Sequence, residues 1–224
     1  MKLRSIVRIV SASLLLLPFG LAGAPAPAEA CGTEFFSVVD HSAENISSAE
    51  KALGQGRYEA AATSVFQIFP KLRSTKVGAG PLSDRALRIL ALAAVRVDGG
   101  LTVGKGVTWP MAGVTPEQKE GNLVFAIDTL RKLNEKRANS PSFQTDLAEA
   151  LGKVPRYRAE SYAILTQLAK KDLVASAEGY ATLARLHEAL GEGAPRDAAV
   201  KRCEGMTKTP KACQVPASPA TTSS

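Results

Sequence analysis

Between about residues 42 and 206, apolar residues recur every three or four positions, and glycine or proline interrupts this pattern at short intervals. This spacing is that of one face of an α-helix. In the second of the predicted helices the apolar positions are Tyr58, Ala61, Ala62, Val65, Phe66 and Phe69. The pattern predicts eight helices: Ser42–Leu53, Tyr58–Phe69, Ser83–Val97, Thr115 to before Ser140, Ser142–Leu151, one from Pro155, Ser176–Leu190, and Pro195 to about Glu204.

Residues typical of helix ends support several of these boundaries. We expect Ser83 to cap the third helix and Thr115 to cap the fourth, with Pro116 as its first helical residue. Gly152 and Gly191 are expected to end the fifth and seventh helices. Only 5% of the residues are aromatic, whereas 45% are hydrophobic, with many alanines and leucines. This composition favours helices over a β-sandwich, so we predict an all-α fold in which short turns join antiparallel helix pairs.

The helical segments also show a weak internal period. Leu147 and Ala150, which precede the turn at Gly152, correspond to Leu183 and Leu186 after a shift of 36 residues. This shift is close to the period of helix-turn-helix repeats. Stacked pairs of this kind bury a continuous apolar core that a single pair cannot bury alone.

One segment, Gly56-Arg57-Tyr58-Glu59-Ala60-Ala61 with a terminal Pro70, resembles the turn and second helix of a tetratricopeptide repeat. Pro155-Arg156-Tyr157 with Ala159, and Ala184 to Gly191 followed by Ala198-Ala199, are weaker copies. The resemblance covers residues 42–206 and implies a short α-solenoid whose groove binds a protein or peptide partner. Helix two is about three residues short of the family pattern, and a generic α-solenoid or an irregular helical bundle is the alternative.

An insertion at residues 98–114 separates the third and fourth helices and contains five glycines and the only tryptophan, Trp109. Segments 101–103 and 107–109 are expected to pair as a small hairpin. The run Gly99–Gly106 partly matches a phosphate-binding loop, but Gly106 stands where that motif needs Ser or Thr, and a helix precedes it. We therefore expect an inserted loop, in which Trp109 either covers the third and fourth helices or contacts a partner.

Residues 1–30 have the layout of a secretory signal peptide: a basic start, an apolar run and an Ala28-Glu29-Ala30 site before Cys31. We therefore expect export to the periplasm, the cell surface or the medium, and no transmembrane segment in the mature chain. Cys31 stands where a bacterial lipoprotein carries its lipid, although the preceding residues match that motif poorly. A lipoprotein anchored through Cys31 is the alternative.

The rest of the chain divides into an N-terminal segment, residues 31–41, the helical domain, residues 42–207, and a tail rich in Pro, Ser and Thr, residues 208–224. We expect this tail to be disordered. An exported chain meets oxidising conditions, so we predict a disulfide between Cys203 and Cys213, at the junction of the last helix and the tail. Pairing of Cys31 with either cysteine is the alternative.

The net charge is +7, and without residues 1–30 the chain keeps 25 basic and 20 acidic residues, spread along its length. This pattern does not indicate a nucleic-acid partner. The chain has two histidines and lacks the local motifs of zinc and serine hydrolases. We therefore expect no metal, no cofactor and no enzymatic activity, with an enzyme of dispersed site as an alternative. A structural or assembly accessory is a further alternative.

Two groups of polar residues are candidates for contact with a partner, which we expect to be a protein or peptide. Arg85, Arg88 and Arg96 fall on one face of the third helix. Thr182 and Arg185, with Glu178, fall on one face of the seventh. We predict partner binding by Trp109 and by these arginines and Thr182, with solvated helix faces as the alternative.

Overall fold

The computed structural model describes residues 41–104, 111–208 and 210–215. Within these ranges the regular secondary structure is helical. The α-helices are α1 (Ser42–Gly54), α2 (Tyr58–Ile68), α3 (Pro81–Arg96), α4 (Pro116–Lys136), α5 (Pro141–Gly152), α6 (Arg158–Lys170), α7 (Ala177–Ala189) and α8 (Gly193–Met206). The 3-10 turns are η1 (Leu72–Ser74), η2 (Pro155–Tyr157) and η3 (Pro210–Cys213).

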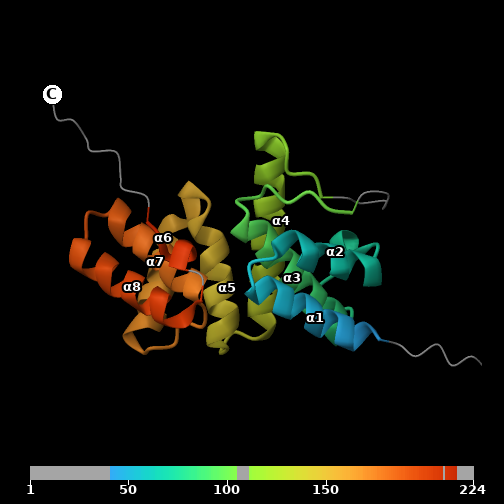
Figure 1. Ribbon diagram of the computed structural model, residues 1–224, viewed down its shortest axis with the longest axis horizontal. Coiled ribbons are helices and arrows are strands. Elements are labelled where there is room, and N and C mark those ends of the chain that lie inside the picture. Colours follow the sequence, from blue (N-terminus) through green and yellow to red (C-terminus); the bar gives the residue numbers. More distant parts are fainter. Residues whose placement is uncertain (1–40, 105–110, 209, 216–224) are drawn as a thin grey trace, which may run out of the picture. The chain divides into compact units, whose positions relative to one another are not determined.

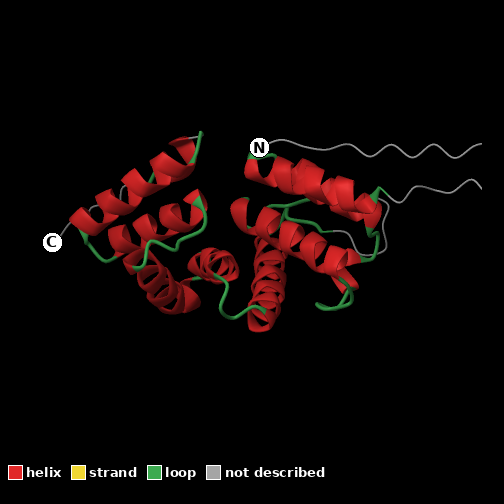
Figure 2. Ribbon diagram, turned by 90° about the horizontal axis from the view of Figure 1, so that it is seen from below, coloured by secondary structure: helices red, strands yellow, loops and turns green. Residues whose placement is uncertain are grey.

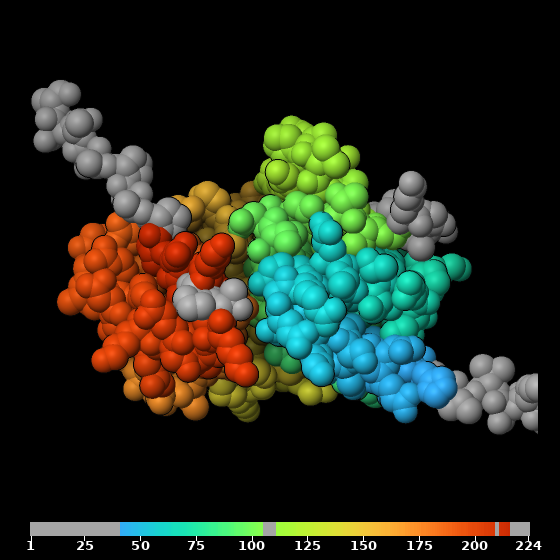
Figure 3. Space-filling view, in the orientation of Figure 1, coloured from blue at the N-terminus to red at the C-terminus, as the bar shows by residue number. Residues whose placement is uncertain are grey.

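Helices that follow one another in the sequence pack side by side (Figures 1 and 2). The pairs are α1 with α2, α3 with α4, α5 with α6, and α7 with α8. Each second helix also contacts the first helix of the next pair, and the odd-numbered helices α1, α3, α5 and α7 contact one another in that order. In the space-filling view, helices that are close in the sequence again lie next to each other, as the order of colours from blue to red shows (Figure 3). The predicted all-α helical-repeat arrangement is confirmed.

The start of α4 follows its prediction, whereas the start of α3 does not. Thr115 caps α4, and a capping box joins it to Gln118 in both directions. The predicted cap of α3, Ser83, lies inside that helix, and its hydroxyl donates to the carbonyl of Gly80 at 2.9 Å. The helix begins at Pro81 because the fixed φ of proline suits the first helical position, where its missing N–H costs nothing.

Smaller differences appear at the ends of later helices. Ser176, the first residue of the seventh predicted helix, caps α7 by accepting a hydrogen bond from the Gly179 N–H at 3.0 Å. The sixth predicted helix is divided into the turn η2 and α6, which begins at Arg158. Helix α8 begins at Gly193, two residues before the predicted Pro195.

Two clusters of buried apolar residues form the core. The first extends from α1 to α5 and includes Ile46, Leu90 and Leu130. The second joins α5 to α6, α7 and α8 and includes Leu165 and Leu183. Since α5 contributes to both clusters, it links the two halves of the core. Among the described residues, no helix combines the length and apolar character that a membrane span requires.

The described ends of the insertion pack against the helices. Leu101, Val103 and Met111 are buried, and Val103 forms an antiparallel bridge with Met111. This bridge lies two residues beyond the second strand of the predicted hairpin. Residues 105–110, which include Trp109, lie outside the described residues. Whether Trp109 covers α3 and α4 or contacts a partner therefore stays a prediction.

Asn122 of α4 holds this insertion in place. Its side chain is buried, and its amide nitrogen lies 2.8 Å from the Gly99 carbonyl, 3.1 Å from that of Ala112 and 3.3 Å from that of Leu101. Gly99 has φ +76°, and a side chain there would collide with the backbone of Lys119. The insertion therefore approaches α4 more closely than any residue but glycine allows.

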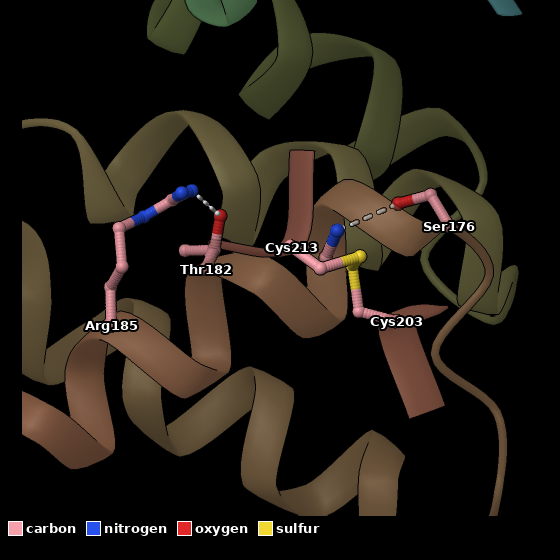
Figure 4. The surroundings of a disulfide bond; sticks show 6 residues. Ser176, Thr182, Arg185, Cys203 and Cys213 are labelled. Carbon is pink, nitrogen blue, oxygen red and sulfur yellow. Dashed lines mark hydrogen bonds between the residues drawn. A yellow bond between two sulfur atoms is a disulfide. The ribbon is translucent and has the colours of Figure 1, made fainter. Parts of the chain in front are cut away.

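A disulfide between Cys203 and Cys213 fixes the segment that follows α8 (Figure 4). The two Cα atoms are 5.7 Å apart, both side chains are buried, and η3 packs against α7 as well as α8. This is the pair that the sequence predicts; Cys31 and the predicted signal peptide lie outside the described residues. Closing so short a loop stabilises the fold by at most about 3 kcal/mol in the chain-entropy model.

We predict that Asn122→Ala destabilises the domain by about 1–3 kcal/mol, because buried carbonyl groups lose their donor. Urea unfolding followed by circular dichroism measures this change. Asn139→Ala, at an exposed position, is the matched control and is expected to change stability by less than about 0.5 kcal/mol. Equal stability of the two variants would show that Asn122 does not anchor the insertion.

Candidate partner-binding site

The first of the predicted arginines, Arg85, forms an ion pair on the surface. Its guanidinium donates to both carboxylate oxygens of Glu50 in α1, at 2.9 and 2.8 Å. The two side chains are 38% and 41% exposed, so water and salt screen this pair. A pair of this kind contributes about 0–1 kcal/mol.

Arg88 pairs with a buried carboxylate. Its Nε donates to Asp146 of α5 at 2.5 Å, and its guanidinium lies 4.8 Å from the centre of the Phe143 ring. Burial raises the pKa of the Asp146 carboxyl, and the positive charge of Arg88 opposes this rise. The ring and the carboxylate together hold Arg88 against α5.

Arg96 forms the most deeply buried charged cluster among the described residues. Its Nε and NH2 groups donate to the two oxygens of Glu149 in α5, at 2.9 and 3.3 Å, and its NH1 lies 3.6 Å from Glu178 of α7. Arg96 is 8% exposed and Glu149 2% exposed. Burial disfavours the charged guanidinium, but the attraction of Glu149 outweighs it and raises the pKa of Arg96. One guanidinium therefore connects three helices.

The three arginines of α3 thus form ion pairs with carboxylates of this chain. Thr182 and Arg185 of α7, in contrast, line a pocket. The Thr182 hydroxyl accepts a hydrogen bond from Arg185 NH2 at 3.1 Å (Figure 4). Burial lowers the pKa of the Arg185 guanidinium, which the more distant charges of Glu149 and Asp98 partly offset. Among the described residues, no carboxylate lies within ion-pair distance of Arg185.

The hollow, which we call the α5–α7 pocket, has a volume of about 380 Å³. The residues around it that carry charge or shape its wall are Asp98, Gly152, Lys153, Arg158, Thr182 and Arg185. The carboxylate among its described lining residues, Asp98, accepts a hydrogen bond from Lys153 at 2.6 Å. Arg158 is exposed on the rim. The wall therefore carries three positive charges and one negative charge.

Gly152 brings α5 close to α7 beside this pocket. A side-chain carbon at position 152 would lie 2.5 Å from the Thr182 methyl group and 3.1 Å from the Ser161 hydroxyl. The glycine that the sequence suggests as a helix end thus also serves as a contact between helices. Gln214, which follows the disulfide, also lines the pocket.

The sequence did not single out Asp98, Lys153 or Arg158. Asp98 lies in the turn after α3, Lys153 at the end of α5 and Arg158 at the start of α6. Sequence spacing along one helix cannot relate these three positions, because packing of different helices brings them together. A weak signal was available, since Lys153 lies within the Gly152–Pro155 turn between two helices and Arg158 follows it.

A second polar cluster joins α6, α7 and the start of α8. His187 is buried, and its Nδ1 lies 2.6 Å from Glu192, which also accepts from the Tyr162 hydroxyl at 3.1 Å. The hydrogen bond from His187 lowers the pKa of the Glu192 carboxyl. His187 thus lies at the edge of the core. In the described part of the chain, no group of three His, Cys, Asp or Glu side chains has an arrangement suited to a metal ion.

We predict that Arg96→Met destabilises the domain by about 3–5 kcal/mol, because Glu149 keeps a buried charge without its partner. The free energy of unfolding in urea is the measurement. Arg85→Met removes the exposed pair and serves as the control, with an expected loss of at most about 1 kcal/mol. The double variant Arg96→Met/Glu149→Met should regain much of the lost stability. Equal losses of stability in Arg96→Met and Arg85→Met would contradict the buried cluster.

No protein-family model, curated protein or solved structure matches this chain. The function is therefore inferred from the chain's own geometry, and the α5–α7 pocket is the feature on which that inference rests.

Proposed function

We propose that this chain is an exported helical-repeat protein that binds a protein or peptide partner in the bacterial cell envelope. The α5–α7 pocket carries this proposal. It is open to solvent at Arg158 and Ala189, and its wall has more positive than negative charge. A pocket of this size accepts a side chain or a short segment of a partner.

The packing of the helices supports a binding role. Four helix pairs follow one another, and the odd-numbered helices contact each other along the series. Such stacks present an extended surface for partners. With the Gly56-Arg57-Tyr58 turn, where Gly56 has φ +76°, this packing supports our assignment of the fold to the tetratricopeptide kind.

Two observations support export. Residues 1–30 have the layout of a signal peptide. The disulfide between Cys203 and Cys213 suits an oxidising compartment. Cleavage after Ala30 leaves Cys31 as the first residue of the mature chain.

Intact-mass analysis of the protein from an expressing bacterium tests this processing. The expected mass is that of residues 31–224 with one disulfide and no lipid. Attachment of a diacylglyceryl group would instead make the protein a lipoprotein anchored through Cys31. A chain that retains residues 1–30 would contradict cleavage.

Site-specific photo-crosslinking tests partner binding at the pocket. A photoreactive phenylalanine analogue at Ala189, exposed on the rim, is expected to form a defined adduct in the envelope fraction. The same analogue at Glu135, exposed on α4 and outside the pocket, is the control and is expected to form none.

Charge reversal links the adduct to the pocket. Arg158→Glu should reduce the Ala189 adduct at least fivefold without lowering the melting temperature, because Arg158 is exposed and a carboxylate suits the first turn of α6. Equal adducts at Ala189 and Glu135, or an adduct that is insensitive to Arg158→Glu, would contradict binding at this site.

A further inference from the structure

The period of 36 residues relates two interfaces between odd-numbered helices. It places Thr182 and Arg185 of α7 at the positions that Asp146 and Glu149 hold in α5. Asp146 and Glu149 face α3, where each carboxylate accepts a hydrogen bond from an arginine. At the corresponding positions, α7 presents a hydroxyl and a guanidinium in place of the two carboxylates.

The α5–α7 interface therefore lacks the charge pairing of the α3–α5 interface. At its hollow, Lys153 from the end of α5 and Arg185 from α7 line the same pocket. Lys153 is neutralised by Asp98, which sits in a turn and not on a facing helix. In the α3–α5 interface a carboxylate occupies the space beside the arginine, whereas here a volume of about 380 Å³ is open.

The hydrogen-bonding capacity of Arg185 points to the same conclusion. A guanidinium has five N–H donors, and among the described residues Arg185 uses NH2 to bond Thr182. Thr182 is buried and holds the guanidinium at the pocket wall. Glu149 and Asp98 attract the Arg185 guanidinium without a hydrogen bond to it, since Glu149 is bonded to Arg96 and Asp98 to Lys153. An arginine held in this way has a planar set of donors available to an oxyanion.

We propose that the α5–α7 pocket binds an oxyanion, a carboxylate or a phosphate, through the guanidinium of Arg185. Lys153 and Arg158 add positive charge around it. The bound group would accept hydrogen bonds from Arg185 as the Glu149 carboxylate accepts them from Arg96. This inference deepens the proposed function, since it names the chemical group by which a partner is recognised.

NMR titration of the purified, disulfide-bonded chain tests the proposal with free anions, so that its outcome does not depend on finding a partner. Sodium acetate and inorganic phosphate are added at constant ionic strength in chloride, and the arginine Nε–Hε signals are followed. The Arg185 signal is expected to shift to saturation. An acetylated, amidated peptide containing two glutamates, with its glutamine counterpart as control, distinguishes a peptide carboxylate from free phosphate as the preferred source.

Three variants give the decisive comparison. Arg185→Met should weaken anion binding at least tenfold, and Arg185→Lys should retain part of it, since it keeps the charge and loses the planar donors. Arg57→Gln removes an exposed guanidinium whose hydrogen bond among the described residues is to the Gln55 side chain, and this variant should bind anions as the unaltered chain does. Anion shifts of equal size at Arg57 and Arg185, or unchanged binding in a folded Arg185→Met variant, would overturn the proposal.

Discussion

The buried cluster of Arg96, Glu149 and Glu178 connects three successive odd-numbered helices and constrains the rest of the structure. A carboxylate that is 2% exposed is stable in its charged form only if a cation and hydrogen bonds replace its water. Arg96 supplies both, and this requires the end of α3 to lie against the middle of α5. Apolar packing alone would allow these helices to slide, whereas the two bonds from Arg96 to Glu149 fix their register.

We infer that this cluster contributes more to specificity than to net stability. The desolvation of two charges offsets most of their attraction, so a well-packed apolar pair of equal volume is often as stable. A mispaired helix, however, would leave Glu149 charged and buried, which costs about 3–5 kcal/mol. We infer that Arg88 and Arg96 select this order of helices among the alternatives that similar apolar faces permit.

The parts of the fold that depend on local pattern were predictable from the sequence. Apolar spacing located the eight α-helices found in the described ranges, and the Thr115-Pro116 start and the Cys203–Cys213 pair were recognised from neighbouring residues. The site was less predictable. Arg88 and Arg96 lie on a polar helix face by spacing, but spacing does not reveal the carboxylates of α5 that neutralise them. Asp98, Lys153 and Arg158 meet only because three different helix ends converge.

The period of 36 residues relates positions in different helices, which the spacing along one helix cannot do. Equivalent positions in a repeat share a place in the packing and not a chemical role, so Asp146 and Glu149 can serve the core where Thr182 and Arg185 line a pocket. In a stack of similar pairs, we take a change of charge pattern at an equivalent position as the place to propose contact with a partner. The change from a carboxylate to a guanidinium at the position of Glu149 is such a place, and Gly152 brings α5 close to α7 beside it.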